Sequence, residues 1–314
     1  MGRRQRNDVR TLEVWADWRG LDGPTRAGHL RAQVVRGSEV LGFEYDRAWL
    51  STVRVPIDPN LPLFEGQHHV PAHLPQFGMV ADASPDRWGR TLLKRRERQR
   101  ARQEGRRPRT LMASDYLLGV HDGHRMGALR FCLPGGPFLD DDDDTAAPPW
   151  TSLAELAFAS QQLERKGVED EPEYGRWLAM LLAPGRSLGG ARPKASVRDD
   201  EGHLWIAKFP SAHDEHDVGA WEAVAHLLAT KAGLRVPEAR AQRFANDHHT
   251  FLSRRFDRQG GERLAFSSAM TQLGQADGDV DPEVGYLEMA SFLARVGAAP
   301  EVDLPALWRR VVFN

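Results

Sequence analysis

Residues that could bind an anion gather in one glycine-rich segment, Ser187-Leu-Gly-Gly-Ala-Arg-Pro-Lys194. Its paired Gly189 and Gly190 let backbone N–H groups approach an anion closely, and the cations at its end add positive charge. The segment matches neither common phosphate loop. Gly185 and Gly190 have Walker-A spacing, but Ala191 stands where that motif needs lysine, and no G-x-G-x-x-G pattern is present. Taken alone, the segment favours an ordinary tight turn.

Lys208 strengthens the case for a binding role. In a strand from His203 to Phe209, residues of alternate positions share one face, so Lys208 points the same way as two apolar residues. A lysine on an apolar face needs an anionic partner or must reach solvent at the strand end. Glu222 lies in the apolar stripe of the next predicted helix and offers that partner. A strand lysine paired with a helix glutamate is the ion pair that orders ATP phosphates in protein-kinase-like folds.

The elements that position these residues are predicted from periodicity and turn residues. A helix is expected to begin with Ser84 as N-cap and Pro85 as first helical residue and to run towards Gly105. Two further predicted helices begin at Ser114 or Asp115 and at Pro172. The other predicted helices cover 153–166, 218–231, 282–296 and 304–313. The predicted strands cover 12–15, 42–45, 128–133, 203–209, 239–244 and 250–254, with one more before the turn at 199–202. The strand at 42–45 is followed by a predicted turn at Trp49-Leu50.

One stretch interrupts this pattern. Pro and Gly follow Leu133, and then come the acidic run Asp140 to Asp144 and the pair Pro148-Pro149. Adjacent carboxylates repel one another, and Pro and Gly oppose regular structure, so the stretch is typical of a linker. We therefore expect an N-terminal domain over 1–140, an acidic linker over 141–149 and a second domain over 150–314. A long surface loop inside one domain fits the composition nearly as well.

The overall composition limits the class of protein. The chain has 314 residues, of which 41% are hydrophobic, and its formal net charge is -2. A wholly disordered chain and a global polycation are thereby excluded. Cys132 is the only cysteine, so neither an internal disulfide nor a cysteine zinc cage can form. No signal peptide or long apolar run is apparent, and we expect a cytoplasmic protein without membrane contact.

Several blocks of the sequence resemble the HipA-type serine/threonine kinase toxins of bacterial toxin–antitoxin systems. The blocks occur in the family's order and span almost the whole chain. They are Phe43-Glu-Tyr-Asp46, Asp58-Pro-Asn-Leu-Pro-Leu63, Ser84-Pro-Asp-Arg-Trp-Gly-Arg90, Asp115-Tyr-Leu-Leu-Gly119, Gly127-Ala-Leu-Arg-Phe131, Ser187 to Lys194, Ile206-Ala-Lys-Phe-Pro210 and Ser253-Arg-Arg-Phe-Asp-Arg258. The resemblance implies an α+β fold, with a protein-kinase-like small lobe and an incomplete helical lobe behind a mixed α/β N-terminal domain.

The resemblance also implies roles. Ser187 stands at the position of the loop serine whose phosphorylation silences such kinases. The other expected ATP-binding residues are Gly189, Gly190, Lys194, Lys208, Arg255 and Phe256, together with Glu222 from helix phase. ATP and magnesium are the implied cofactors, and a helix-turn-helix antitoxin is the implied partner, through which the chain would meet DNA only indirectly.

One departure from the family concerns catalysis. Family members continue past Phe-Asn with an Asp-x-His-x-x-Asn-type segment and a later metal-binding aspartate, whereas this sequence stops at Asn314. His121-Asp122-Gly123-His124 is nearest in composition but lies in the N-terminal domain. We therefore assign no catalytic residue and no magnesium ligand in this chain. A second chain that supplies the missing lobe is a further expectation, and the apolar stripe over 304–313 would meet it.

Other motifs have ordinary interpretations. The basic stretch Arg87 to Arg109 could grip a phosphate backbone, although a solvated helix face is favoured. We interpret the histidines at 68, 69, 73, 213 and 216 as surface residues and Cys132 as a small core residue. Two function classes remain open. The chain is either a HipA-like protein kinase or its ATP-binding part, or a catalytically inactive nucleotide- or antitoxin-binding module.

Overall fold

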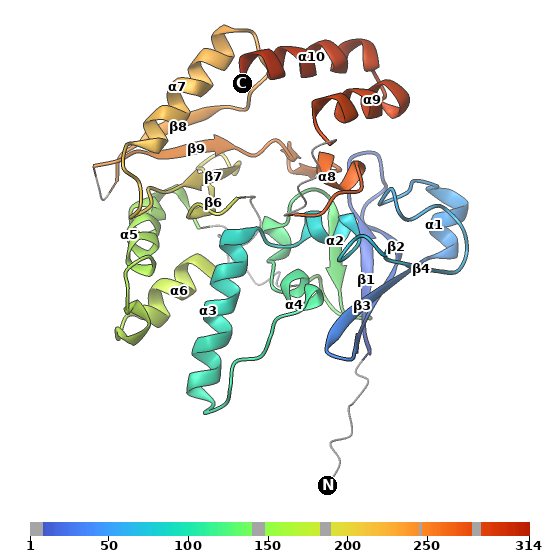
Figure 1. The fold of residues 1–314 in the computed structure, drawn as a ribbon, viewed down its shortest axis with the longest axis horizontal. Coiled ribbons are helices and arrows are strands. Elements are labelled where there is room, and N and C mark those ends of the chain that lie inside the picture. The colour runs from blue at the N-terminus through green and yellow to red at the C-terminus, as the bar shows by residue number, and fades with distance from the viewer. Residues whose placement is uncertain (1–8, 140–147, 183–189, 245–246, 278–283) are drawn as a thin grey trace.

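The structure is a computed structural model that describes residues 9–139, 148–182, 190–244, 247–277 and 284–314 (Figure 1). Ser187 and Gly189, two of the expected ATP-binding residues, lie outside these ranges, as does most of the predicted linker. No helix among the described residues is long and apolar enough to cross a membrane.

An antiparallel five-stranded sheet organises the first part of the chain, with strand order β4-β3-β2-β1-β5. The strands are β1 (Val9–Ala16), β2 (Thr25–Val35), β3 (Ser38–Tyr45), β4 (Gln67–His69) and β5 (Leu129–Cys132). The short helices α1 (Arg47–Thr52), α2 (Gly78–Ala83) and α4 (Ala113–Leu118) contribute to the same core. Alternating side chains such as Leu12 and Val14 are fully buried there, as the period of two in a one-sided sheet requires.

Two local expectations in this part were wrong. Trp49-Leu50, predicted to form a turn after the strand, belongs to helix α1, from which Trp49 reaches the core and its indole N–H donates to the carbonyl of Val55 at 2.9 Å. Helix α3 (Arg87–Gln103) begins after Asp86 and not after Ser84. The Asp86 carboxylate accepts a hydrogen bond from the N–H of Gly89 at 2.7 Å, so the aspartate is the N-cap.

A second, four-stranded antiparallel sheet lies in the later part of the chain, with order β6-β7-β9-β8. Its strands are β6 (Lys194–Arg198), β7 (Leu204–Lys208), β8 (Ala239–Gln242) and β9 (Thr250–Arg254). Helices α5 (Leu153–Leu163) and α6 (Tyr174–Leu182) pack on one face, where Trp205 and Ala207 are buried. Helix α7 (Val218–Lys231) contacts β8 and β9.

Helix α3 packs in the second core, although it lies in the first part of the chain. It precedes the predicted linker, yet its Trp88 and Leu92 are buried in the same cluster as α5, α6 and β7. The division into domains at 140 and 150 remains a prediction.

The last part of the chain is mainly helical. After the short strands β10 (Arg258–Gln259) and β11 (Glu262–Arg263) come α8 (Ala269–Gln272), α9 (Tyr286–Val296) and α10 (Pro300–Phe313). Helix α10 starts at Pro300, before the predicted 304, with proline in its first turn. Asp303, which could have capped a helix that starts at 304, therefore lies inside the first turn. Figure 1 places α7, α9 and α10 along one edge of the molecule and the far end of α3 at the opposite edge.

Candidate functional site

Lys208 and Glu222 form the ion pair that the sequence predicted. Lys208 ends strand β7, and its Nζ lies 2.6 Å from Oε2 of Glu222 on α7. The ammonium also lies 5.5 Å from the centre of the Phe251 ring on β9. The side chains of Lys208 and Glu222 are 35% and 29% exposed. Lys208 is therefore held in place while its charge remains accessible to a ligand.

Lys208 shares its face of β7 with Leu204 and Ile206, as the alternation predicted, but this is the less buried face of the strand. The drier face of β7 holds Trp205 and Ala207, which are 1% and 0% exposed and pack towards α5 and α6. Lys208 lies on the opposite face of the strand, on the side of α7. Because its side chain is partly exposed there, the ammonium group loses less of its hydration than it would on the buried face. A ligand with several negative charges can approach this face.

Lys194 has a different environment. Its side chain is 2% exposed, and its Nζ lies 2.9 Å from Oδ2 of Asp86 and 3.1 Å from the carbonyl oxygen of Gly190. Burial lowers the pKa of Lys194 and raises that of Asp86. The indole N–H of Trp88 also donates to the carbonyl of Lys194 at 3.1 Å. These contacts fasten the end of the glycine-rich segment to the start of α3, and they occupy the lysine that was expected to contact ATP.

Gly190 lies at the described start of this segment and has a φ of +86°, which suits glycine. Two positions later, Arg192 forms a two-point ion pair with Asp214, with one N–O distance of 2.8 Å. Strand pairing places Lys194 opposite Lys208. The fold thus brings Gly190, Lys194 and Lys208 to one end of the second sheet.

Arg255 and Phe256 follow strand β9 at its other end. The Arg255 side chain is fully buried, and its backbone N–H donates to the carbonyl of Leu204 at 2.8 Å. Phe256 is 61% exposed. Within the described residues, no hydrogen bond engages the N–H of Phe256. Since strands rise about 3.3 Å per residue, Leu204 and Lys208 lie about 13 Å apart along β7. An elongated ligand could therefore contact Phe256 at one end and Lys208 at the other.

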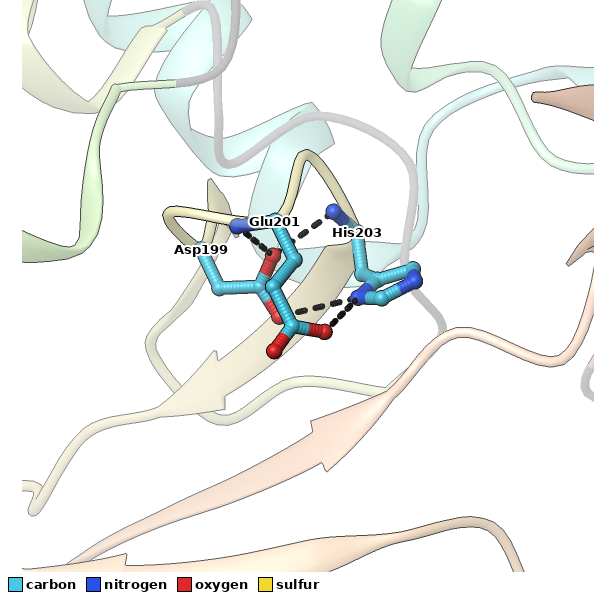
Figure 2. Close-up of side chains that lie close together, drawn as sticks. All are labelled: Asp199, Glu201 and His203. Atoms are coloured by element: carbon cyan, nitrogen blue, oxygen red, sulfur yellow. Dashed lines mark hydrogen bonds and ion pairs between the residues drawn. The ribbon is translucent and has the colours of Figure 1, made fainter. Parts of the chain in front are cut away.

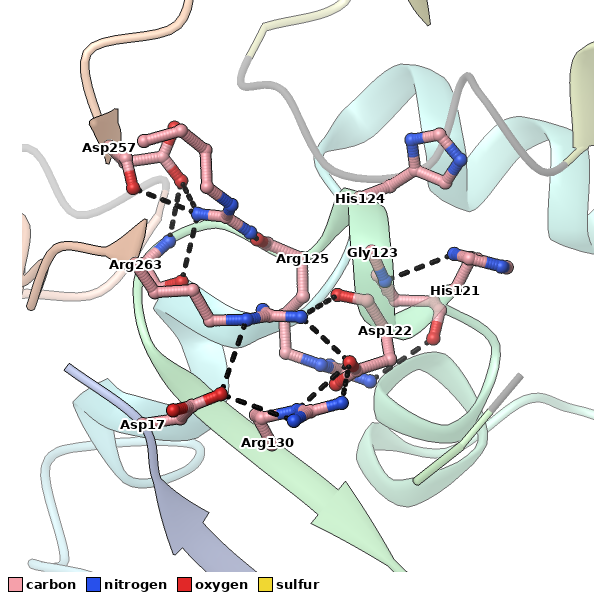
Figure 3. A network of polar contacts seen from close by, with 12 residues as sticks. Asp17, His121, Asp122, Gly123, His124, Arg125, Arg130, Asp257 and Arg263 are labelled. Carbon is pink, nitrogen blue, oxygen red and sulfur yellow. Dashed lines mark hydrogen bonds and ion pairs between the residues drawn. The ribbon is translucent and has the colours of Figure 1, made fainter. Parts of the chain in front are cut away.

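A buried charge network holds the segment after β9 against the first part of the chain (Figure 3). Arg255 donates to the carbonyls of His124 and Arg125 at 2.8 and 3.2 Å and pairs with Asp257 at 2.7 Å. Asp257 also accepts from the N–H of Gly127 at 2.9 Å. Arg258 also pairs with Asp257, at 2.6 Å. Burial lowers the pKa of Arg258 to about 9, so its side chain stays charged at neutral pH.

The same network continues through Asp122. Its carboxylate lies 2.6 Å from Arg130 and 2.7 Å from Arg263. Burial alone would raise the pKa of Asp122, but these arginines outweigh burial and lower it. The segment His121-Asp122-Gly123-His124 therefore has a structural role in the described contacts, as a joint between two parts of the chain. Sequence reasoning missed this joint because its members are distant in the chain and follow no motif.

The described residues contain one group with the composition of a metal site, Asp199, Glu201 and His203 (Figure 2). It occupies the turn between β6 and β7, at the end of the hairpin away from Lys194 and Lys208. Asp199 accepts hydrogen bonds from the N–H groups of Glu201 and His203 and from the Trp205 indole, so it is already used to close the turn. This group cannot serve a triphosphate at Lys208.

Cys132 is buried, and its Sγ lies 3.3 Å from Oε2 of Glu13. Burial and the nearby carboxylate raise the pKa of the thiol to about 11, so it stays protonated at neutral pH. The prediction of a core residue is confirmed. The predicted surface position of His68 was wrong, because its side chain packs against Tyr45 and Phe64 and the residue is 5% exposed.

Comparison with known proteins shows which of them this chain is similar to. Residues 186–314 match the family model described as HipA-like C-terminal domain. The chain is also similar in structure to a protein of the Shewanella oneidensis MR-1 toxin–antitoxin complex of HipA, HipB and operator DNA. That match has a TM-score of 0.60 and 16% identity, and it covers 96% of this chain and 68% of the other. No curated protein matches.

These findings confirm the expected resemblance. Residues 186–314 are similar to the HipA-like C-terminal domain, and the structural match shows an α+β fold like that of the Shewanella protein over 96% of this chain.

Proposed function

We propose that this chain is a HipA-type toxin whose second sheet binds ATP. The accessible Lys208–Glu222 ion pair is the observation that carries the proposal, because this pairing orients a lysine towards nucleotide phosphates in kinase-like folds. In the proposed pose, the adenine lies beside Phe256 and the phosphates lie near Gly190 and Lys208. We assign Lys194 to anchoring the glycine-rich segment, since its ammonium already contacts Asp86 and Gly190.

Titration calorimetry with ATP tests the binding site. We expect Lys208→Ala to weaken ATP binding at least tenfold, because the phosphates lose a charge-assisted partner. Glu222→Gln should weaken it less, because the lysine remains but is less well oriented. Lys231→Ala is the matched control, since Lys231 is exposed at the far end of α7. Equal affinities for the wild type and Lys208→Ala, or no binding by either, would refute the site.

The proposed reaction is transfer of the ATP γ-phosphate to a serine or threonine of a protein. ATP would supply the phosphoryl group, and magnesium would neutralise its charge. The alternative is a non-catalytic nucleotide- or antitoxin-binding module. One observation favours this alternative. Among the described residues, the one candidate metal cluster is the Asp199 group, and it lies at the end of the β6–β7 hairpin away from Lys208.

Mass spectrometry after incubation with ATP and magnesium separates these functions. We expect no phosphate on Ser187, the proposed regulatory site, from this chain alone, because we assign it no catalytic residue or magnesium ligand and expect a second chain to supply them. The protein must first be treated with phosphatase, so that phosphate added in the expression host is removed. New phosphate on Ser187 of the wild type, and not of Lys208→Ala, would establish kinase activity and refute the non-catalytic alternative.

The proposed partner is a helix-turn-helix antitoxin, which we expect to contact the N-terminal region. The structural neighbour forms a complex with HipB and operator DNA, and this supports such an assembly. Hydrogen exchange on the full chain, with and without a co-expressed antitoxin, tests the location. Protection confined to residues 150–314 would contradict it.

A further inference from the structure

Helix α3 and the loop after it form the most strongly charged surface of the described chain. Between Lys94 and Arg109 there are nine Lys and Arg residues and two Glu, a local net charge of +7 on a chain whose total is -2. This surface lies at the edge of the molecule opposite α7, α9 and α10 (Figure 1). It takes no part in the proposed ATP site.

The cations of α3 form a continuous stripe. Lys94, Arg98 and Arg102 are exposed and recur every fourth residue, so they share one face of the helix. At a rise of 1.5 Å per residue, neighbours in the stripe are about 6 Å apart along the axis. The position four residues before Lys94 is Arg90, which is half-buried and lies over the Tyr116 ring, 4.9 Å from its centre. No carboxylate therefore interrupts the stripe.

Internal ion pairs account for only part of the positive charge. Glu97 pairs with Arg106 and Arg109, and both of those arginines extend from the loop after the helix. Arg102 contacts Asp170, but both side chains are more than half exposed, and such a pair stabilises little. Lys94 and Arg98 have no ion-pair partner within the described residues. The mutual repulsion of these cations is therefore only partly offset by ion pairs within the molecule.

We infer that the α3 stripe, defined as Lys94, Arg98 and Arg102, binds the phosphate backbone of duplex DNA. A membrane surface fits less well, because no large apolar side chain is exposed between residues 94 and 109. An acidic protein fits less well too, since the stripe has no aromatic or aliphatic anchor. DNA offers a regular row of phosphates along each strand, which a row of evenly spaced cations complements. The choice of DNA over RNA rests on the proposed toxin–antitoxin function.

Such a contact orients the protein without reading sequence, because phosphates are the same at every base pair. In an assembly with a DNA-binding antitoxin, the stripe would add affinity and leave the choice of site to the partner. This differs from the expectation that the chain meets DNA only through the antitoxin.

Fluorescence anisotropy with a labelled mixed-sequence duplex of about 20 base pairs tests the inference, using the full chain. The triple variant K94Q/R98Q/R102Q should bind at least tenfold more weakly at about 50 mM salt. Its slope of log K against log salt should be smaller in magnitude by about 2–3, because three fewer phosphate contacts release fewer counterions. The control R36Q/R54Q/R243Q removes three exposed arginines elsewhere and should leave both quantities unchanged.

Three outcomes would overturn the inference. They are absence of wild-type binding, equal loss in the control triple variant, or displacement of DNA by polyglutamate at equal charge concentration. Tighter binding of duplex RNA with the same sequence would overturn the commitment to DNA. Calorimetry with ATP on the same preparations distinguishes the proposals. If ATP binds normally and DNA does not, only the α3 inference fails; if ATP does not bind, the proposed ATP site fails.

Discussion

Asp86 and Lys194 form a buried ion pair with an N–O distance of 2.9 Å, although 108 positions separate them in the chain. Asp86 caps helix α3, and Lys194 begins strand β6. The pair therefore couples the start of a helix in the first part of the chain to the end of the glycine-rich segment in the second. Movement of either element would expose or separate two charges that water no longer solvates.

The first prediction concerns this pair. Lys194→Met should lower the free energy of unfolding by about 3–5 kcal/mol, because Asp86 then loses its buried countercharge. The double variant Asp86→Asn/Lys194→Met should lose less than the sum of the single losses. Urea unfolding followed by circular dichroism measures these values. Lys166→Met, at an exposed lysine, should change stability by no more than about 0.5 kcal/mol. A loss below about 1 kcal/mol for Lys194→Met would contradict this account of the pair.

The second prediction concerns Arg255 as a joint between the two parts of the chain. Arg255→Met leaves the carbonyls of His124 and Arg125 without this donor and removes one partner of Asp257. We expect a loss of about 3–5 kcal/mol in unfolding free energy. Arg254→Met is the control, since the neighbouring side chain is 37% exposed. Calorimetric scanning should also resolve two transitions in Arg255→Met where the wild type has one. Similar stability of both variants would show that the joint is dispensable.

The third prediction is a pH dependence at Asp217, the N-cap of α7. Burial alone would raise its pKa, but hydrogen bonds from His249 and from the N–H of Ala220 outweigh burial and lower the pKa to about 2. A lowered carboxyl pKa stabilises the fold above the ordinary value of 3.8, and this contribution is lost as pH falls towards 2. It amounts to about 2 kcal/mol at neutral pH.

Asp217→Asn should therefore be less stable than the wild type by about 1–2 kcal/mol at pH 7. The difference should fall to roughly half by pH 3, because the carboxyl of the unfolded wild type, with the ordinary pKa of 3.8, is mostly protonated there while the folded one is still ionised. Urea unfolding across this pH range measures both values. Asp200→Asn, at an exposed turn position, is the control and should show no such trend. A difference that stays constant from pH 7 to pH 3 would refute the role of the Asp217 charge.

The fourth prediction concerns the apolar side chains on the last two helices. Leu287 on α9 and Trp308 and Val312 on α10 are 79%, 66% and 65% exposed. Exposed apolar surface of this kind drives association. We expect the chain to bind a hydrophobic dye and to self-associate, and a covering partner chain should suppress both. The double variant Leu287→Ser/Trp308→Ser should reduce dye fluorescence and light scattering, whereas Val40→Ser, on the first sheet, should not. A monomeric wild type that binds no dye would refute the prediction.

The sequence alone determined several local elements and the resemblance to HipA-type proteins. Residue periodicity and turn residues indicated α7 over 218–231 and β9 over 250–254, and both have those bounds in the structure. Helix phase also identified Glu222 as the partner of Lys208. These features depend on residues close together in the chain, where patterns of period two and 3.6 carry the information.

Only the tertiary structure decided which charges became internal. Lys194 carries the same charge as Lys208 and lies opposite it in the sheet, yet one is buried against Asp86 and the other is accessible. The face of β7 that holds Lys208 was likewise decided by where α5 and α6 pack, which alternation along a strand cannot indicate. The hydrogen bonds from Arg255 to the carbonyls of His124 and Arg125 connect segments that are distant in the chain. No pattern of residue spacing in the sequence indicates such a contact. Burial and pairing of charge depend on which surfaces meet, and the order of residues along the chain does not specify that directly.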